Sequence, residues 1–98
     1  MSVVRIINDT VHLFENSGNL IRTITSGAVS AQISPDESRI VLVTESGTAQ
    51  LWDVRGNYLQ DITSGAVDAR FSGDLIIVTK EYGPDEVRDG LGNFLRNI

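Results

Sequence analysis

Apolar residues along the chain gather in short runs that are separated by turn-forming residues. In the middle of the chain this pattern predicts four short strands: Val29–Ser34, Arg39–Glu45, Thr48–Val54 and Tyr58–Thr63. Ser-Pro-Asp, Ser-Gly and Arg-Gly-Asn sequences between the runs suit tight turns. We expect an antiparallel meander, with Val29, Ala31 and Ile33 on one face of its first strand.

The second of these strands has no polar face. Its RIVLV sequence has counterparts in DLIIV at Asp74–Val78 and VVRII at Val3–Ile7. A strand of a sheet with one solvated face would alternate between apolar and polar residues. The runs therefore predict sheets that are covered on both faces, as in the blades of a propeller or the layers of a solenoid.

A long internal repeat accounts for the whole chain. Gly18–Ser34 and Gly56–Ser72 are identical at ten of seventeen positions, and both contain ITSGAV. A third partial copy, GNFLRNI, occupies Gly92–Ile98, and Thr10–Asn19 matches Thr48–Asn57. The same structural unit is therefore expected to recur along one repeat domain, residues 1–98.

The repeated Ser-Gly-Ala-Val sequence is expected to join one unit to the next. Gly27 and Gly65 would permit a backbone conformation that other residues rarely adopt. Ala28 and Ala66 are small, as residues must be where neighbouring sheets converge. The same junction would be needed at each unit, which explains why the same residues recur.

The stretch Ser34–Val54, SPDESRIVLVTESGTAQLWDV, resembles the core of a WD40 β-propeller repeat. Trp52 and Asp53 carry the family's characteristic dipeptide, whereas Phe14 and Arg88 stand at the tryptophan position in the other units. The resemblance implies four-stranded blades. The Gly-His pair of the family is replaced by Ser-Gly, and the one histidine, His12, lies elsewhere, so we expect no hydrogen-bonded network between histidine and tryptophan.

Strand counting predicts an all-β propeller protomer with about three four-stranded antiparallel blades. Residues 2–25 would hold a partial blade without its inner strand, residues 26–63 a full blade, and residues 64–98 a full but shortened blade. Three blades cannot close a ring, because propellers typically have four to eight. The terminal blades would each expose an apolar face, so we expect homo-oligomers: a six-bladed homodimer is favoured over a nine-bladed homotrimer.

Composition excludes several classes of function. The formal net charge of −5 disfavours binding to nucleic acid, and the absence of cysteine excludes disulfides and zinc fingers. Neither a signal peptide nor a membrane-spanning run is expected, so the default location is the cytoplasm.

Catalytic and metal-binding patterns are weak. His12 lies alone on a strand, and the acidic pairs near Asp36 and Asp85 suit solvated turns better than a pocket. We expect no enzyme activity, cofactor or metal. Trp52 is expected to pack on its own blade, although a surface indole could also stack on a sugar.

The sequence favours a self-assembling scaffold or protein-interaction module. Loops that lead into the inner strands, together with the strand turns, form the expected binding face, whose candidate residues are Ser26, Ser64, Asp9, Ser46 and Tyr82. The alternative is a carbohydrate-binding, lectin-like propeller, for which Tyr82 and Tyr58 are the available loop aromatics.

Overall fold

Eleven β-strands and no helix make up residues 2–98, the part of the chain that the computed structural model describes. The strands are β1 (Ser2–Ile7), β2 (Thr10–Glu15), β3 (Leu20–Ser26), β4 (Ala28–Ile33), β5 (Arg39–Thr44), β6 (Ala49–Asp53), β7 (Tyr58–Thr63), β8 (Ala66–Ser72), β9 (Leu75–Lys80), β10 (Glu86–Asp89) and β11 (Phe94–Asn97). The all-β prediction is confirmed.

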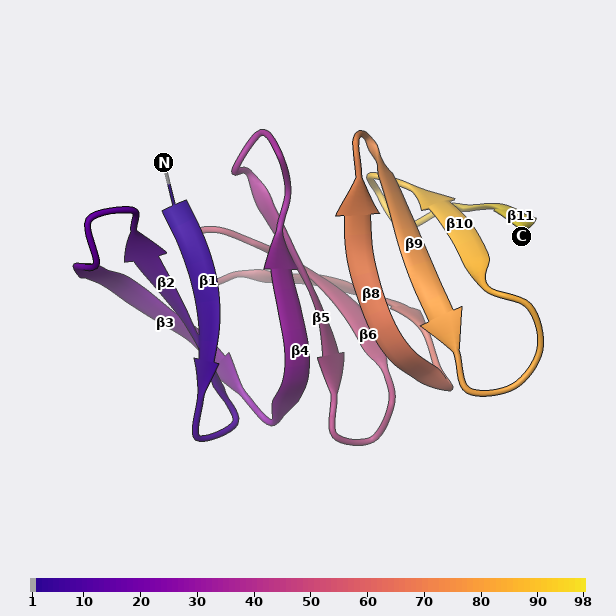
Figure 1. The fold of residues 1–98 in the computed structure, drawn as a ribbon, viewed down its shortest axis with the longest axis horizontal. Helices are drawn as coiled ribbons and strands as arrows, with labels where there is room; N and C mark the ends of the chain where they lie inside the picture. The colour runs from indigo at the N-terminus through magenta and orange to yellow at the C-terminus, as the bar shows by residue number, and fades with distance from the viewer. Residues whose placement is uncertain (1) are drawn as a thin grey trace.

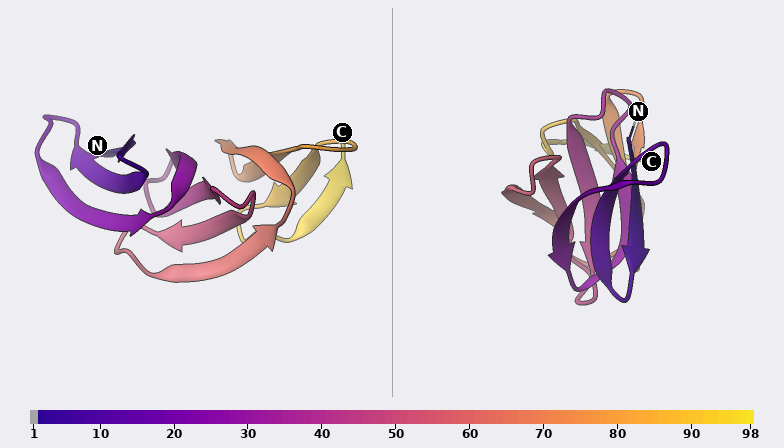
Figure 2. Two further views of the ribbon diagram at one scale, coloured as in Figure 1. Left: turned by 90° about the horizontal axis from the view of Figure 1, so that it is seen from below. Right: turned by 90° about the vertical axis from the view of Figure 1, so that its left-hand side faces the viewer.

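Three antiparallel meanders form three separate sheets. The first contains β1-β2-β3, the second β4-β5-β6-β7 and the third β8-β9-β10-β11. The sheets stand side by side along the chain (Figure 1), and a view from below shows them on an open arc with β1, β4 and β8 toward its concave side (Figure 2).

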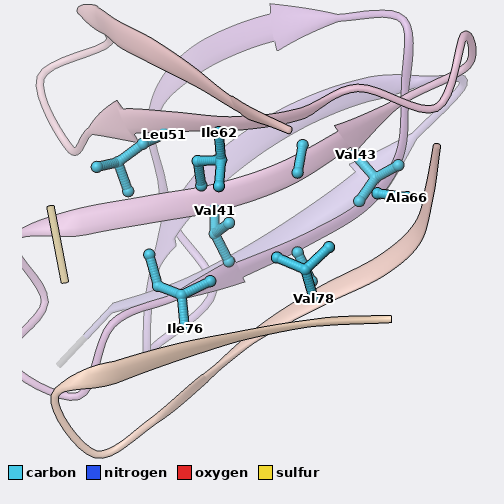
Figure 3. Packing of buried hydrophobic residues seen from close by; sticks show 9 residues of the cluster. Val41, Val43, Leu51, Ile62, Ala66, Ile76 and Val78 are labelled. Carbon is cyan, nitrogen blue, oxygen red and sulfur yellow. The ribbon is translucent and has the colours of Figure 1, made fainter. Parts of the chain in front are cut away.

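The central strand β5 is buried on both faces, as its uninterrupted apolar sequence predicts. Ile40 and Leu42 belong to the core between the first and second sheets, which also contains Val11 and Leu13 of β2. The second core lies between the second and third sheets. It is formed by Val41, Val43, Ala49, Leu51, Ile62, Ala66, Ala69, Ile76 and Val78 (Figure 3). Burial of both faces of β5 holds the three sheets together, since apolar burial is the main stabilising term in folding.

One expectation about the inner strand is wrong. Val29 does not share a face with Ala31 and Ile33, because a bulge between Ala28 and Ser30 inserts Val29 as an extra residue. Val29 is therefore 57% exposed, and the equivalent bulge in β8 leaves Val67 51% exposed. A bulge shifts the alternation of side chains by one residue, which a two-residue sequence pattern does not reveal.

The Ser34–Ser38 turn is held by a compact hydrogen-bond network. The Ser34 hydroxyl donates to Asp36 Oδ1 over 2.6 Å and accepts from the backbone N–H of Arg39 over 3.0 Å. Both the hydroxyl and the backbone N–H of Ser38 also donate to Asp36 Oδ1. Hydrogen bonds from Ser34 and then Ser38 lower the pKa of Asp36 to about 2, because they favour the ionised carboxylate.

Candidate interaction surfaces

The loops that the sequence analysis singled out gather at one end of the molecule, the lower end in Figure 1. Backbone hydrogen bonds link them in series: the Ala28 N–H donates to Asp9 O, and the Glu45 N–H donates to Gly27 O. The next junction repeats both bonds, with Ala66 N–H to Gly47 O and Glu81 N–H to Gly65 O, each over 2.8 Å. We call this end the junction end.

All five candidate residues of the junction end are exposed to solvent. Asp9, Ser26, Ser46 and Ser64 are exposed, and Tyr82 is 84% exposed. They come from turns of all three sheets, so the structure brings together the residues that the repeat pattern suggested. Whether they bind a partner stays a prediction.

Gly27 and Gly65 have the positive φ angles that the sequence analysis expected, 78° and 66°. The alanines that follow them are enclosed: Ala28 is fully buried and Ala66 is 5% exposed. At Gly47 a Cβ atom would lie at an ordinary contact distance of 3.5 Å from Ala66 O, so its positive φ of 87° is what favours glycine there. The junction therefore depends on small residues for both backbone conformation and packing.

Trp52 lies partly buried against the core between the first and second sheets. Its Nε1–H donates to Gln50 Oε1 over 3.0 Å, and its ring meets the ring of Tyr58 edge-on at 5.6 Å. The indole is thus engaged by its own sheet, as expected. The one histidine is remote: His12 Nδ1 lies 3.1 Å from Thr23 Oγ1 in the first sheet, so no histidine–tryptophan network forms.

Phe14 and Arg88 occupy the position of Trp52 in the first and third sheets, as the strand registers show. Each also pairs with the side chain two residues before it. Phe14 packs near His12, with ring centroids 6.1 Å apart, and Arg88 Nε donates to Glu86 Oε1 over 2.9 Å. The same structural position therefore makes a tilted aromatic pair in the first sheet, an indole hydrogen bond in the second and an ion pair in the third.

Asp53 caps the turn that follows its strand. Its carboxylate accepts from the backbone N–H groups of Arg55 and Asn57, both over 2.9 Å. The bond from Asn57 is the main cause that lowers the pKa of Asp53. Asp89 repeats the arrangement with Leu91 and Asn93 in the third sheet, so these aspartates are turn caps.

Two further acidic residues, Glu86 and Glu37, are engaged in structural contacts. Glu86 lies 2.9 Å from Arg88 and 3.8 Å from Lys80, and Glu37 Oε1 accepts from the Ser2 N–H over 2.6 Å. Within residues 2–98 no group of three or more histidine, cysteine or acidic side chains is arranged to hold a metal ion. The described residues also contain no helix of the length and apolarity needed to cross a membrane.

The outer face of the first sheet is a mixed surface. Val4 and Ile6 point into the core, so alternation along β1 places Val3 and Arg5 on the opposite, open face. Val3 pairs with Phe14, and Arg5 pairs with His12. We call this surface the first end face.

The outer face of the third sheet is the second end face. Ile76 and Val78 point into the core, so Ile77 and Thr79 point outward, and Ile77 pairs with Val87. Ile77 is only 9% and Val87 1% exposed, although neither belongs to a core between sheets. The expectation of two broadly exposed apolar faces is therefore wrong. Residues of the same sheet shield these apolar side chains, and Arg5 adds a charge to the first end face.

A pocket of about 420 Å³ opens between the second and third sheets at the end opposite the junction end. Its lining includes Asp36, Arg39, Phe71, Asp74 and Leu91. The Arg39 guanidinium is fixed by a 2.7 Å hydrogen bond to Gly90 O. The sequence analysis did not identify this pocket. The Ser-Gly-Asp turn that lines it in the third sheet is shorter than the Ser-Pro-Asp-Glu-Ser turn that lines it in the second sheet, and this difference is visible in the sequence.

The three aromatic residues considered for sugar binding do not form one shared surface, because Tyr82 lies apart from the Trp52–Tyr58 pair. Tyr58 follows the β6–β7 turn, whereas Tyr82 lies in the β9–β10 loop at the junction end. Trp52 packs against the core instead of standing in either loop. No shared stacking platform forms from these three residues.

Comparison with solved structures identifies the architecture. The chain superposes on the computationally designed Ika8 protein with a TM-score of 0.71 at 24% sequence identity, covering 98% of this chain and 33% of that one. It superposes equally well, at a TM-score of 0.71, on Kluyveromyces lactis Hsv2 at 15% identity, covering 99% of this chain and 33% of that one. The fold is that of a β-propeller.

The three sheets are accordingly propeller blades, and the chain spans about a third of the length of each of these two structures. No protein-family model matches the sequence, and no curated protein matches it. The WD40 resemblance of Ser34–Val54 therefore stays a prediction about the repeat, whereas the propeller fold is established by the superpositions.

Proposed function

We propose that this chain is a non-enzymatic interaction module that assembles head to tail with copies of itself into a closed propeller. The observation that supports it best is the equivalence of the strands. β9 presents Ile77 and Thr79 to the open side, at the positions where β5 presents Val41 and Val43 to the core with the third blade. Another copy of the chain could pack on the second end face in the same way as the third blade packs on the second blade.

The number of copies follows from the number of blades. Two chains would bring six blades, inside the usual range of four to eight, and three chains would bring nine. A homodimer is therefore favoured over a homotrimer. Each contact would join the second end face of one copy to the first end face of the next, a heterologous contact that closes when the rotation between copies fits the ring.

The assembled ring would display the junction end several times. Asp9, Ser26, Ser46, Ser64 and Tyr82 would recur around one side of it, which suits a protein partner with several binding points. The polar character of these residues, apart from the tyrosine ring, favours a hydrogen-bonded contact over an apolar one. Catalysis forms no part of the proposal.

Two variants with a charge on one end face each test the head-to-tail contact. Val3→Asp alters the first end face, and Thr79→Asp alters the second, where Thr79 points outward and is only half-buried. Each variant alone is expected to sediment as a monomer, because every contact in its ring contains one altered face. Circular dichroism of each variant confirms that the blades remain folded.

Mixing the two variants gives the decisive result. The unaltered second end face of Val3→Asp can meet the unaltered first end face of Thr79→Asp, so the mixture is expected to form pairs with one intact contact. Analytical ultracentrifugation measures this directly. Folded variants that stay monomeric when mixed, or that assemble when kept apart, contradict the proposed contact.

A further inference from the structure

The inner edge of the first blade differs from the corresponding edge of the other two. β5 pairs with β4 on one side and β6 on the other, and β9 pairs with β8 and β10. β1 occupies the same place in its blade, since it packs on β4 as β5 packs on β8. Among the described residues it pairs with β2 alone, so its other edge has no strand partner, although Glu37 Oε1 accepts from the Ser2 N–H at its start.

Residues beside this edge are more exposed than the equivalent residues of the other blades. Val41 and Val43 of β5 are 0% and 1% exposed, whereas their equivalents Val4 and Ile6 in β1 are only half-buried. The same holds on the facing strand: Ala69 of β8 is 2% exposed, but the equivalent Ala31 of β4 is half-buried. These half-buried residues form a strip along the interface between β1 and β4, and we call this strip the slot.

The junction end of this slot is already formed. Asp9 O accepts from the Ala28 N–H in the first junction as Gly47 O accepts from Ala66 in the second. Glu45 and Glu81 each donate their backbone N–H to a glycine carbonyl at the start of an inner strand, at Gly27 and Gly65. Asn8 stands at the matching place in the first blade, so a strand that began with glycine would offer it the same carbonyl.

We propose that the free edge of β1 binds an extended segment of another polypeptide with the pattern of β4 and β8, Ser-Gly-Ala-Val-x-Ala. The segment would pair antiparallel with β1, and its main chain would supply most of the affinity. Specificity would come from the alanines, because Ala28 and Ala66 sit where neighbouring blades leave little room. This binding does not depend on ring assembly.

Synthetic peptides test the proposal on the full chain. The probe is the peptide TSGAVSAQIS, which has the sequence of Thr25–Ser34, titrated into the isotope-labelled protein and followed by backbone amide NMR. We expect saturable shifts centred on the amides of Val3–Ile7. A matched peptide in which the first alanine is replaced by phenylalanine should bind about tenfold or more weakly, because the larger side chain overpacks the slot.

Three results would overturn the proposal. These are no saturable binding, equal binding of a peptide with the same residues in scrambled order, and shifts that map to the rim strands β3, β7 and β11 instead of β1. The titration is repeated on Thr79→Asp, whose altered end face lies on the third blade. Peptide binding to this variant is expected to persist. The experiment therefore tests peptide binding separately from the contact between copies.

Discussion

At the scale of single residues, the turns of this propeller depend on short side chains that bind the backbone. Asp53 and Asp89 each accept two backbone N–H bonds over 2.9 Å, and Asp36 is held by Ser34 and Ser38. All three carboxyls have a lowered pKa because these bonds favour the charged form. The folded protein therefore binds protons less readily at these sites than the unfolded chain does.

The Asp36 turn should make stability depend on acidity. The folded pKa of about 2 lies below the ordinary value of 3.8, so the contribution of Asp36 is fully present above the ordinary value. It is lost as the pH falls from 3.8 toward 2. The Tm of the native protein should exceed that of Asp36→Asn at neutral pH, and the difference should shrink over this acidic range. A difference that is independent of pH would contradict the role of the carboxylate.

The junction glycines make a second prediction at this scale. Gly65→Ala should lower the free energy of unfolding by about 1–2 kcal/mol, because alanine must adopt a left-handed backbone conformation. Space is not the obstacle, since the Cβ would meet only the end of the Lys80 side chain at 3.8 Å. Denaturant unfolding measures the loss, with exposed Ser64→Ala as the control. An unchanged midpoint would show that the glycine conformation is not required.

At the scale of elements, the apolar run of each second strand decides the architecture. β5 contributes Ile40 and Leu42 to one core and Val41 and Val43 to the other, so its residues alternate between two buried surfaces. This is why a strand without a polar face predicted stacked sheets, and why the strand order could be derived from the sequence.

Leu42 tests the packing between the first two blades. Leu42→Ala should cost about 2–5 kcal/mol of stability, since the side chain is fully buried and its removal leaves a cavity. Leu42→Asp should abolish folding and solubility together. Val29→Ala, at a 57% exposed bulge, is the control and should change stability by less than about 0.5 kcal/mol. A soluble, folded Leu42→Asp protein would count against the packing.

Other features of the elements could not be predicted from the pattern. The bulge at Val29 reverses the alternation of side chains along β4, and no residue type in β4 marks its place. Bulges depend on pairing with the next strand, which the pattern of one strand does not reveal. The shielding of Ile77 and Val87 depends on side chains of neighbouring strands. The pocket beside Arg39 is lined by residues of two turns that are far apart in sequence. The junction end was predictable because the repeat fixes where each blade joins the next.

At the scale of the whole molecule, the propeller arc ends in two faces that are not identical. Arg5 stands on the first end face at the position that Leu42 and Val78 occupy in the buried interfaces. Leu42 and Val78 are both fully buried. The first end face therefore carries one charge where the interior blades carry an apolar side chain, which should weaken the contact between copies.

Arg5→Leu should strengthen self-association, because it restores the repeat's apolar residue and removes the cost of dehydrating a guanidinium. Sedimentation equilibrium measures the change in the dissociation constant. Arg22→Leu, which alters an exposed arginine on a rim strand, is the matched control and should leave association unchanged. Weaker association of Arg5→Leu would mean that the arginine makes a favourable contact across the interface.

The most direct test of the account is the mass of the native chain in solution, measured by light scattering on a sizing column over a range of concentrations. The chain has a mass of 10.7 kDa, and we predict a particle of two chains, which corresponds to six blades in a ring. Three chains would keep the head-to-tail contact and give nine blades. A folded monomer at every concentration would contradict ring closure by self-assembly, because three blades would then be stable with both end faces open.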